Sequence, residues 1–184
     1  MASASIEPKS VPALAAAVIV VMGVSGCGKT TVAQLLAKRL QLEFVEGDSF
    51  HPEANIAKMR AGIALTDTDR QSWLQALAAR LCGLRGQGRG AVLSCSALKR
   101  AYRDVLRSAV PDLHLLHLAG EFDLLSSRLA ARNHHYMPAS LLRSQFADLQ
   151  LPQADERAQS YCVTLPAQDI AERFCKTLYL QSAL

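Results

Sequence analysis

The sequence has few aromatic residues and no dense cluster of positive charge. Phe, Trp and Tyr together make up 5% of the 184 residues, which leaves no clear platform for stacking nucleic-acid bases. The formal net charge is only +4, and no run of Lys and Arg could follow a phosphate backbone. We therefore expect no nucleic-acid partner, whereas the small positive surplus suits a small anionic ligand.

Cysteine pairs are also missing. The chain has five cysteines, an odd number, and none of them forms a C-x-x-C pair. This spacing gives no sign of a zinc site or a disulfide framework. Free thiols are typical of a reducing compartment, so the cysteine pattern predicts a cytoplasmic protein.

The chain lacks a hydrophobic run of membrane-spanning length, which would need about 20 apolar residues. The apolar run Ala13–Met22 follows Lys9, as in a signal peptide, but it leads directly into a glycine-rich loop without a cleavage-like segment. We therefore expect a strand here and no membrane association. The same reasoning makes residues 1–12 a flexible tail and residues 13–184 a single domain.

Short apolar runs alternate with amphipathic segments along the chain. The runs predict strands at Val18–Met22, Glu43–Glu46, Ala91–Cys95, Leu113–Leu118 and Tyr161–Leu165. Apolar residues between Trp73 and Leu84 recur at helical spacing, and the glycine-rich stretch Gly83–Gly90 is expected to end that helix. This order predicts an α/β fold with a five-stranded parallel sheet and helices on both faces. Ligands of such sheets bind beyond the carboxyl ends of the strands.

The segment after the first strand matches the phosphate-binding pattern G-x-x-x-x-G-K-[ST] without a gap. The predicted nucleotide-binding residues are Gly23, Val24, Ser25, Gly26, Cys27, Gly28, Lys29, Thr30 and the adjacent Thr31. The glycines allow backbone N–H groups to turn inward around phosphate oxygens, and the following helix adds its positive dipole end. Lys29 would meet the β- and γ-phosphates, and the Thr30 hydroxyl would bind Mg²⁺. ATP and Mg²⁺ are thus the expected cofactors.

The rest of the sequence narrows the class of phosphate-loop protein. No guanine-reading N-K-x-D motif is present, which argues against a regulatory GTPase. The third strand ends at Ser94-Cys95-Ser96 without the acid that large motor-type ATPases carry there. Asp48 follows the second strand, an arrangement typical of small-molecule kinases in which the acid faces both the metal and the acceptor hydroxyl. We therefore predict Lys29 and Asp48 as catalytic residues; the alternative for Asp48 is a helix N-cap.

Further motifs accompany the phosphate loop. They are Gly47–Pro52 with Asn55 and Lys58, Leu65–Arg70 with Trp73, Cys95–Arg100 with Tyr102–Asp104, and His135–Pro138 with Ser144-Gln145. From Val18 onward the chain with these motifs resembles the gluconokinase family, in the shikimate and nucleoside-monophosphate kinase-like branch of P-loop proteins. The resemblance implies ATP-dependent phosphorylation of gluconate at O6, and a homodimer. Two alternatives remain open: a kinase for shikimate or another sugar acid, and a nucleotide-binding module without catalysis.

The resemblance also implies an acceptor site that suits the chemistry of gluconate. A sugar acid needs cations for its carboxylate, and mixed donors and acceptors for its hydroxyls. The candidate substrate-binding residues are Asp48, His51, Lys58, Arg70, Ser96, Lys99, Arg103, His135 and Gln145. Arg70 resembles the arginine that binds the sugar acid in related kinases. His51 could instead cap a helix, and Arg103 could lie on a solvated helix face.

A polar segment near residue 130 predicts a small helical lid over the active site, at about 128–145. Arg128 and Arg132 are one helical turn apart, which places both guanidinium groups on one face. Similarity to the family implies that Arg128 stacks on adenine and that Arg132 approaches the phosphates as a third catalytic residue. Pro166, after the last predicted strand, would then lie against the opposite face of adenine.

Overall fold

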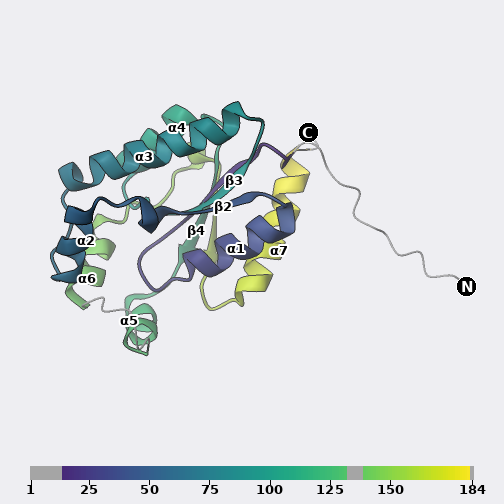
Figure 1. The fold of residues 1–184 in the computed structure, drawn as a ribbon. Helices are drawn as coiled ribbons and strands as arrows, with labels where there is room; N and C mark the ends of the chain where they lie inside the picture. The colour runs from purple at the N-terminus through teal and green to yellow at the C-terminus, as the bar shows by residue number, and fades with distance from the viewer. Residues whose placement is uncertain (1–13, 132–138, 183–184) are drawn as a thin grey trace, which may run out of the picture.

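The computed structural model describes residues 14–131 and 139–182. Its strands form one parallel sheet in the order β2-β3-β1-β4-β5. They are β1 (Val18–Met22), β2 (Glu43–Glu46), β3 (Ala91–Ser94), β4 (His114–Ala119) and β5 (Ala158–Cys162). The predicted α/β fold with a five-stranded parallel sheet is confirmed, and helices cover both faces (Figure 1).

The helices alternate with the strands, as βαβ units require. They are α1 (Lys29–Leu40), α2 (Glu53–Arg60), α3 (Asp67–Gly86), α4 (Arg100–Ala109), α5 (Phe122–Ala130), α6 (Ala139–Asp148) and α7 (Ala167–Ser182). Two short 3₁₀ turns are η2 (Gly47–Phe50) and η3 (Ala154–Glu156). Figure 1 shows α3 and α4 on one side of the sheet and α1 and α7 on the other.

The central strand β1 is completely apolar because both of its faces are covered. Val18 and Val20 pack in one hydrophobic cluster, which contains Trp73 of α3. Ile19 packs in a second cluster, which contains Phe174 of α7. Alternate side chains of a strand point to opposite faces, so a run without polar residues is the pattern of a buried parallel strand.

The structure corrects the predicted position of the last strand. It is Ala158–Cys162 rather than Tyr161–Leu165, and its residues pair with β4 from Leu115 onward. The apolar residues that suggested a later strand lie in a turn, in which the N–H of Leu165 donates to the carbonyl of Cys162 at 3.1 Å. At this edge of the sheet the strand is only partly buried, so its apolar signal is weak.

The long helix α3 carries several residues of the predicted acceptor site. It begins at Thr66, whose hydroxyl accepts the N–H of Asp69, while the Asp69 carboxylate accepts the N–H of Thr66. This capping box fixes the first turn. The helix runs through Gly83 to Gly86, beyond the predicted end. None of the described helices is both long and apolar enough to cross a membrane.

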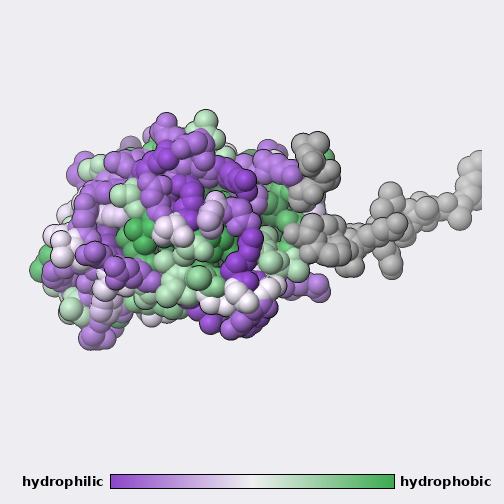
Figure 2. All heavy atoms as spheres, turned by 90° about the horizontal axis from the view of Figure 1, so that it is seen from above, coloured by the Kyte–Doolittle hydropathy of each residue, from purple (hydrophilic) through white to green (hydrophobic). Residues whose placement is uncertain are grey.

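The surface formed by α3 and α4 is mostly hydrophilic, with a hydrophobic area near its middle (Figure 2). A groove of about 340 Å³ lies between the two helices. Its apolar lining includes Leu74, Ala101, Tyr102 and Val105. The phosphate loop and Asp48 lie elsewhere, after the carboxyl ends of β1 and β2.

Candidate active site

The phosphate loop connects β1 to α1. Gly28, the N-cap of α1, has a φ of 95°, a conformation that favours glycine, and an added Cβ would have no neighbour within 4 Å. The loop is therefore open to a ligand at this point. The Lys29 ammonium lies 3.1 Å from the carbonyl oxygen of Val24, so the side chain folds back over the loop. Together with the N-terminus of α1, this lysine makes the loop a site for anions.

A carboxylate that the sequence analysis missed stands beside the loop. Thr30 Oγ1 donates to one carboxylate oxygen of Glu46 at 2.8 Å, and the Ser94 hydroxyl donates to the other. Glu46 is the last residue of β2 and pairs in register with Ser94. The available signal was an acid at the carboxyl end of a strand, two positions before the more prominent Asp48. A hydroxyl beside carboxylate oxygens provides ligands of the kind that Mg²⁺ prefers.

Asp48 follows the β2 strand end in the short turn η2. The Trp73 indole N–H donates to the carbonyl of Gly47 at 2.8 Å, and a Cβ at Gly47 would collide with the carbonyl oxygen of Ser94. These contacts fix the backbone before Asp48, while its side chain is exposed. The alternative roles of Asp48 and His51 as helix caps are wrong. The N-cap of α2 is Pro52, and no side chain caps that helix.

His51 is buried next to Asp48. Its ring stacks on Trp73 with centroids 4.3 Å apart, and its Nδ1 lies 3.4 Å from the side-chain nitrogen of Asn55. Burial lowers the pKa of His51, and Arg70 lowers it further, although Asp48 acts in the opposite direction. The imidazole is therefore neutral at pH 7, and suits a hydroxyl-bearing ligand better than an anion.

Arg70 has the arrangement expected of a buried anion-binding group. Its side chain lies in the first turn of α3, and the residue is only 6% exposed. Its Nε is buried without a hydrogen-bond partner in the described part of the chain. The guanidinium carbon is 5.8 Å from the centre of the Tyr102 ring. A buried donor without a partner destabilises the fold, because it has lost its hydrogen bonds to water. An acceptor atom of a ligand would remove this penalty.

Arg70 also borders a small cavity beneath α6. The other lining residues are Met59, Ile63, Ala64, Leu65, Leu141, Ser144 and Gln145. The cavity measures about 30 Å³, which holds little more than one water molecule. One end of a ligand could therefore enter beside Arg70, while the remainder would lie outside. The charges of Arg70 and Asp48 both affect the pKa of the nearby His51.

Three predicted site residues converge on the carboxyl end of β3. Burial raises the pKa of Cys95, directly after this strand, to about 12. The charge of Asp48 raises it further, whereas Lys29 and Arg70 lower it. All three charges therefore act on one buried thiol. The structure brings the phosphate-loop lysine, the acid and the buried arginine together at the edge of the sheet where ligands are expected.

The two predicted substrate-binding lysines are both engaged in ion pairs. Lys58 Nζ lies 2.7 Å from an Asp69 oxygen, and this contact, with the hydrogen bonds from Thr66, lowers the pKa of Asp69 to about 2. Lys99 Nζ lies 2.7 Å from Asp67 and 3.4 Å from Asp148 of α6. Both lysines therefore connect elements around the site. Ser96 lies beside the phosphate loop, because its carbonyl accepts the N–H of Gly23 at 3.3 Å.

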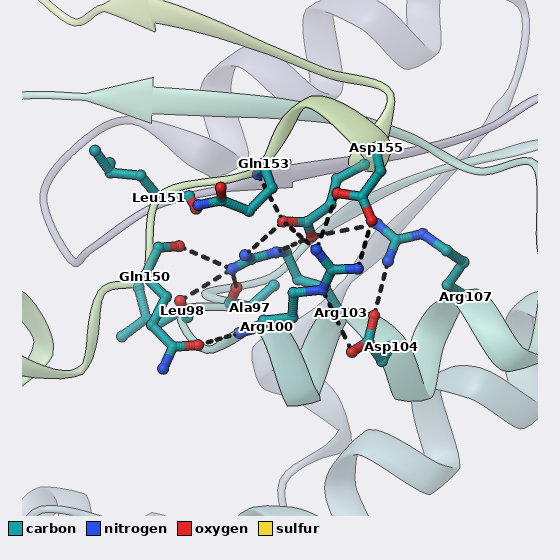
Figure 3. Close-up of polar contacts among 11 residues, drawn as sticks. Ala97, Leu98, Arg100, Arg103, Asp104, Arg107, Gln150, Leu151, Gln153 and Asp155 are labelled. Atoms are coloured by element: carbon teal, nitrogen blue, oxygen red, sulfur yellow. Dashed lines mark hydrogen bonds and ion pairs between the residues drawn. The ribbon is translucent and has the colours of Figure 1, made fainter.

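Arg103 requires a correction, because its side chain is buried and paired within the protein. Its side chain is 0% exposed, which also excludes the solvated helix face. Nε and Nη2 donate to the two carboxylate oxygens of Glu156 at 2.6 and 2.9 Å. Nη1 donates to the carbonyls of Ala97, Leu98 and Gln150, as Figure 3 shows. All three nitrogens are therefore used within the protein.

The pKa of Glu156, the partner of Arg103, is shifted in the direction expected for a buried ion pair. Burial alone would raise the pKa of Glu156, but hydrogen bonds from Arg103 and from the N–H of Gln153 lower it to about 2. Arg107 adds a further donor at 3.3 Å. The cluster holds the segment after α6 against α4, so its role is structural.

We expect Arg103→Met to lower the free energy of unfolding by about 3–5 kcal/mol, because Glu156 would remain buried without its counter-charge. Chemical denaturation would measure the loss. The double variant Arg103→Met with Glu156→Leu should recover much of it, since both charges are then removed. A raised KM for the acceptor with unchanged stability would instead restore Arg103 to the binding site.

The predicted adenine-binding residues lie at the other end of the phosphate loop. Thr31, Arg128 and Pro166 line a cavity of about 330 Å³, together with loop residues such as Gly28. Nη2 of Arg128 donates to the carbonyl of Val163 at 2.9 Å, which holds the guanidinium at the cavity wall. The predicted residues Arg132 and His135 lie outside the described residues. Gln145 is in α6, and its Oε1 accepts the N–H of Ser25 at 2.7 Å.

Comparison with known proteins agrees with this geometry. Residues 18–152 match the family model of the AAA domain. A gluconokinase from Gluconobacter oxydans strain 621H is 52% identical over 143 residues, which cover 75% of this chain and 78% of that protein. The chain belongs to the gluconokinase family. The resemblance predicted from the motifs is confirmed, and the chain is an ATP-using P-loop kinase.

Two solved structures share most of this fold. An unliganded sugar kinase from Janibacter sp. HTCC2649 is 44% identical, with a TM-score of 0.86 over 91% of this chain and 96% of that chain. A gluconokinase from Sinorhizobium meliloti 1021 is 41% identical, with a TM-score of 0.78 over 91% of this chain and 98% of that chain. The structural similarity to these two proteins therefore extends over most of the chain.

Proposed function

We propose that this gluconokinase family member transfers the γ-phosphoryl group of ATP to O6 of gluconate, giving 6-phosphogluconate and ADP. The hydroxyl oxygen forms a bond to the γ-phosphorus while the bond to the β–γ bridging oxygen breaks. The observation that carries the choice of acceptor is the buried Nε of Arg70, which has no partner among the described residues. Arg70 lines the same cavity as Gln145, which makes a hydrogen bond to the phosphate loop, and its guanidinium suits a carboxylate.

Gluconate fits the remaining features around Arg70. Its carboxylate would enter the small cavity and accept from Nε, which satisfies the unpaired donor. Its hydroxyls would meet the neutral imidazole of His51 and the carboxylate of Asp48. Lys58 and Lys99 hold the surrounding helices through their ion pairs. We keep His135 as a further acceptor-site residue from the family pattern.

The nucleotide would lie along the phosphate loop. Backbone N–H groups between Gly23 and Thr31 and the Lys29 ammonium would bind the phosphates. Adenine would occupy the cavity between Arg128 and Pro166. Arg132 is proposed to approach the transferred group, where a cation stabilises the charge of the transition state.

The residues beside the loop also fit a Mg²⁺ ion. The Thr30 hydroxyl and the Glu46 carboxylate would hold it, and Asp48 follows two residues later in the turn η2. Within residues 14–131 and 139–182, no group of three or more acidic, His or Cys side chains gathers at one point. This suits an ion that takes its other ligands from phosphates and water. When bound, Mg²⁺ neutralises charge on the β- and γ-phosphates.

Asp48 is proposed to orient the acceptor hydroxyl and to receive its proton. Phosphoryl transfer has a loose transition state, so positioning matters more than early removal of the proton. The hydrogen bond from Trp73 to the carbonyl of Gly47 holds the backbone immediately before Asp48, which supports this role. The homodimer expected from the family stays a prediction, which analytical ultracentrifugation would test.

Replacing Arg70 with leucine is expected to raise the KM for gluconate by about 30-fold, or roughly 2 kcal/mol, because a buried charged hydrogen bond is lost. The KM for ATP should change little. A coupled assay of ADP release would measure both constants with gluconate, shikimate and nucleoside monophosphates as acceptors. Arg80→Leu is the matched control, since Arg80 lies on the same helix but pairs with Glu43. An unchanged KM for gluconate, or higher turnover with another acceptor, would contradict the proposal.

A further inference from the structure

A side-chain amide of helix α6 makes a hydrogen bond to the phosphate loop. Gln145 Oε1 accepts the N–H of Ser25 at 2.7 Å, although the two residues are 120 positions apart in the sequence. A backbone N–H can only donate, so the amide oxygen must face the loop. The contact therefore fixes the orientation of the Gln145 amide as well as its position.

The contact lies at the end of the loop where the transferred phosphoryl group is expected. The Lys29 ammonium lies 3.1 Å from the carbonyl of Val24, the residue immediately before Ser25. Because this lysine serves the β- and γ-phosphates, Val24 and Ser25 mark the γ-phosphate end. The adenine cavity, with Arg128 and Pro166, lies at the other end.

The same side chain belongs to the cavity beside Arg70. Gln145 lines it together with Leu141 and Ser144, so one face of α6 forms a wall of the proposed carboxylate site. Gln145 thus lies between that site and the γ-phosphate end of the loop. Among the described residues that line the Arg70 cavity, Gln145 is the one whose side chain makes a hydrogen bond to the loop backbone.

The far end of α6 is anchored to the segment after β3. Asp148 pairs with Lys99 at 3.4 Å, and the N–H of Gln150 donates to the carbonyl of Leu98 at 2.9 Å. The Oε1 of Gln150 accepts the N–H of Arg100 at 2.7 Å. With this end held, the hydrogen bond of Gln145 to Ser25 links the cavity wall directly to the phosphate loop.

We propose that Gln145 is a positioning residue that couples the two substrate sites. Nucleotide phosphates that order the loop would hold Gln145, and through it the wall of the Arg70 cavity. Gluconate in that cavity would in turn hold the loop in its phosphate-binding form. The inference rests on the proposed function. Since coupling between two bound ligands is reciprocal, each ligand should tighten the binding of the other by the same factor.

The test is calorimetric titration of gluconate with and without a non-hydrolysable ATP analogue and Mg²⁺. In the wild type we expect gluconate to bind at least about fivefold more tightly in the presence of the analogue. In Gln145→Met, which keeps the length of the side chain but removes the acceptor for Ser25, the factor should fall below about twofold. The reverse titration, analogue with and without gluconate, should give the same two factors.

Gln150→Met is the matched control. Its amide also accepts a backbone N–H at 2.7 Å, but at the start of α4 rather than at the phosphate loop. This variant should keep the coupling of the wild type, even if it lowers the melting temperature as much as Gln145→Met does. A purely structural role of Gln145 would lower stability and leave the coupling factor unchanged.

Three results would overturn the inference: no coupling in the wild type, equal coupling in Gln145→Met, or tighter binding of the ATP analogue to Gln145→Met. The last would mean that Gln145 competes with the phosphates for Ser25. Failure of the wild type to bind gluconate at all would instead refute the proposed function, and the coupling with it. Gluconate binding and the coupling factor are separate measurements, so the two failures can be distinguished.

Discussion

Lys29→Ala is expected to lower the rate of phosphoryl transfer by about 10³-fold. Removal of one group that stabilises charge in a transition state typically has an effect of this size. The Lys29 ammonium touches only the carbonyl of Val24 among the described residues, and it lies over a loop that is otherwise open at Gly28. The side chain therefore contributes little to folding. The variant should lose turnover while it keeps its secondary structure and melting temperature.

The measurement is the rate of ADP release at saturating gluconate, together with circular dichroism and a thermal melt. Lys38→Ala is a suitable control, because Lys38 lies on the same helix with an exposed side chain. It should retain full activity. If Lys29→Ala kept most of its activity, this loop would not be the phosphate site that the mechanism requires.

The parts of the fold that could be predicted are those specified by adjacent residues. The phosphate loop is a continuous pattern, and β1 is apolar throughout, so both were placed correctly from the sequence. β5 was misplaced because it is a partly buried edge strand, and the apolar residues after it belong to a turn. In that region the pattern of apolar residues does not predict which residues pair with the neighbouring strand.

Two arginines show where sequence reasoning about the site reaches its limit. Arg70 and Arg103 both belong to polar motifs near strand ends, and both are buried. Arg103 finds its carboxylate in Glu156, which is 53 residues further along the chain. Arg70, which lines the cavity, keeps a nitrogen without a partner among the described residues. Only the tertiary contacts decide which cation is available to a ligand.

Glu46 illustrates the opposite case, a residue that the motifs did not single out. Its importance depends on Thr30 and Ser94, which reach it from two different elements. The strand register brings Ser94 beside it, and the phosphate loop brings Thr30. The sequence therefore predicted one acid after β2, whereas the structure shows two acids close together at this point. One of them could bind the metal while the other receives the proton.

Asp48→Asn separates these two acids. The substitution preserves the size of the side chain but removes the carboxylate that is proposed to receive the proton of the acceptor hydroxyl. Loss of a general base typically costs about 10²–10⁴-fold, and we expect this loss to fall on kcat. Binding of ATP should change little, because the phosphate loop provides most of its contacts. Single-turnover transfer at saturating ATP, Mg²⁺ and gluconate measures the chemical step directly.

Glu46→Gln is the informative comparison for this experiment. If Glu46 holds the metal with Thr30, its variant should require a higher Mg²⁺ concentration and recover activity as Mg²⁺ is added. Asp48→Asn should not recover, because its missing function is proton acceptance. Melting curves of both variants would exclude misfolding, since the backbone at Gly47 is held by Trp73 rather than by either acid. A transfer rate near that of the wild type for Asp48→Asn would contradict its catalytic role, and rescue of that variant by Mg²⁺ would reassign Asp48 to the metal site.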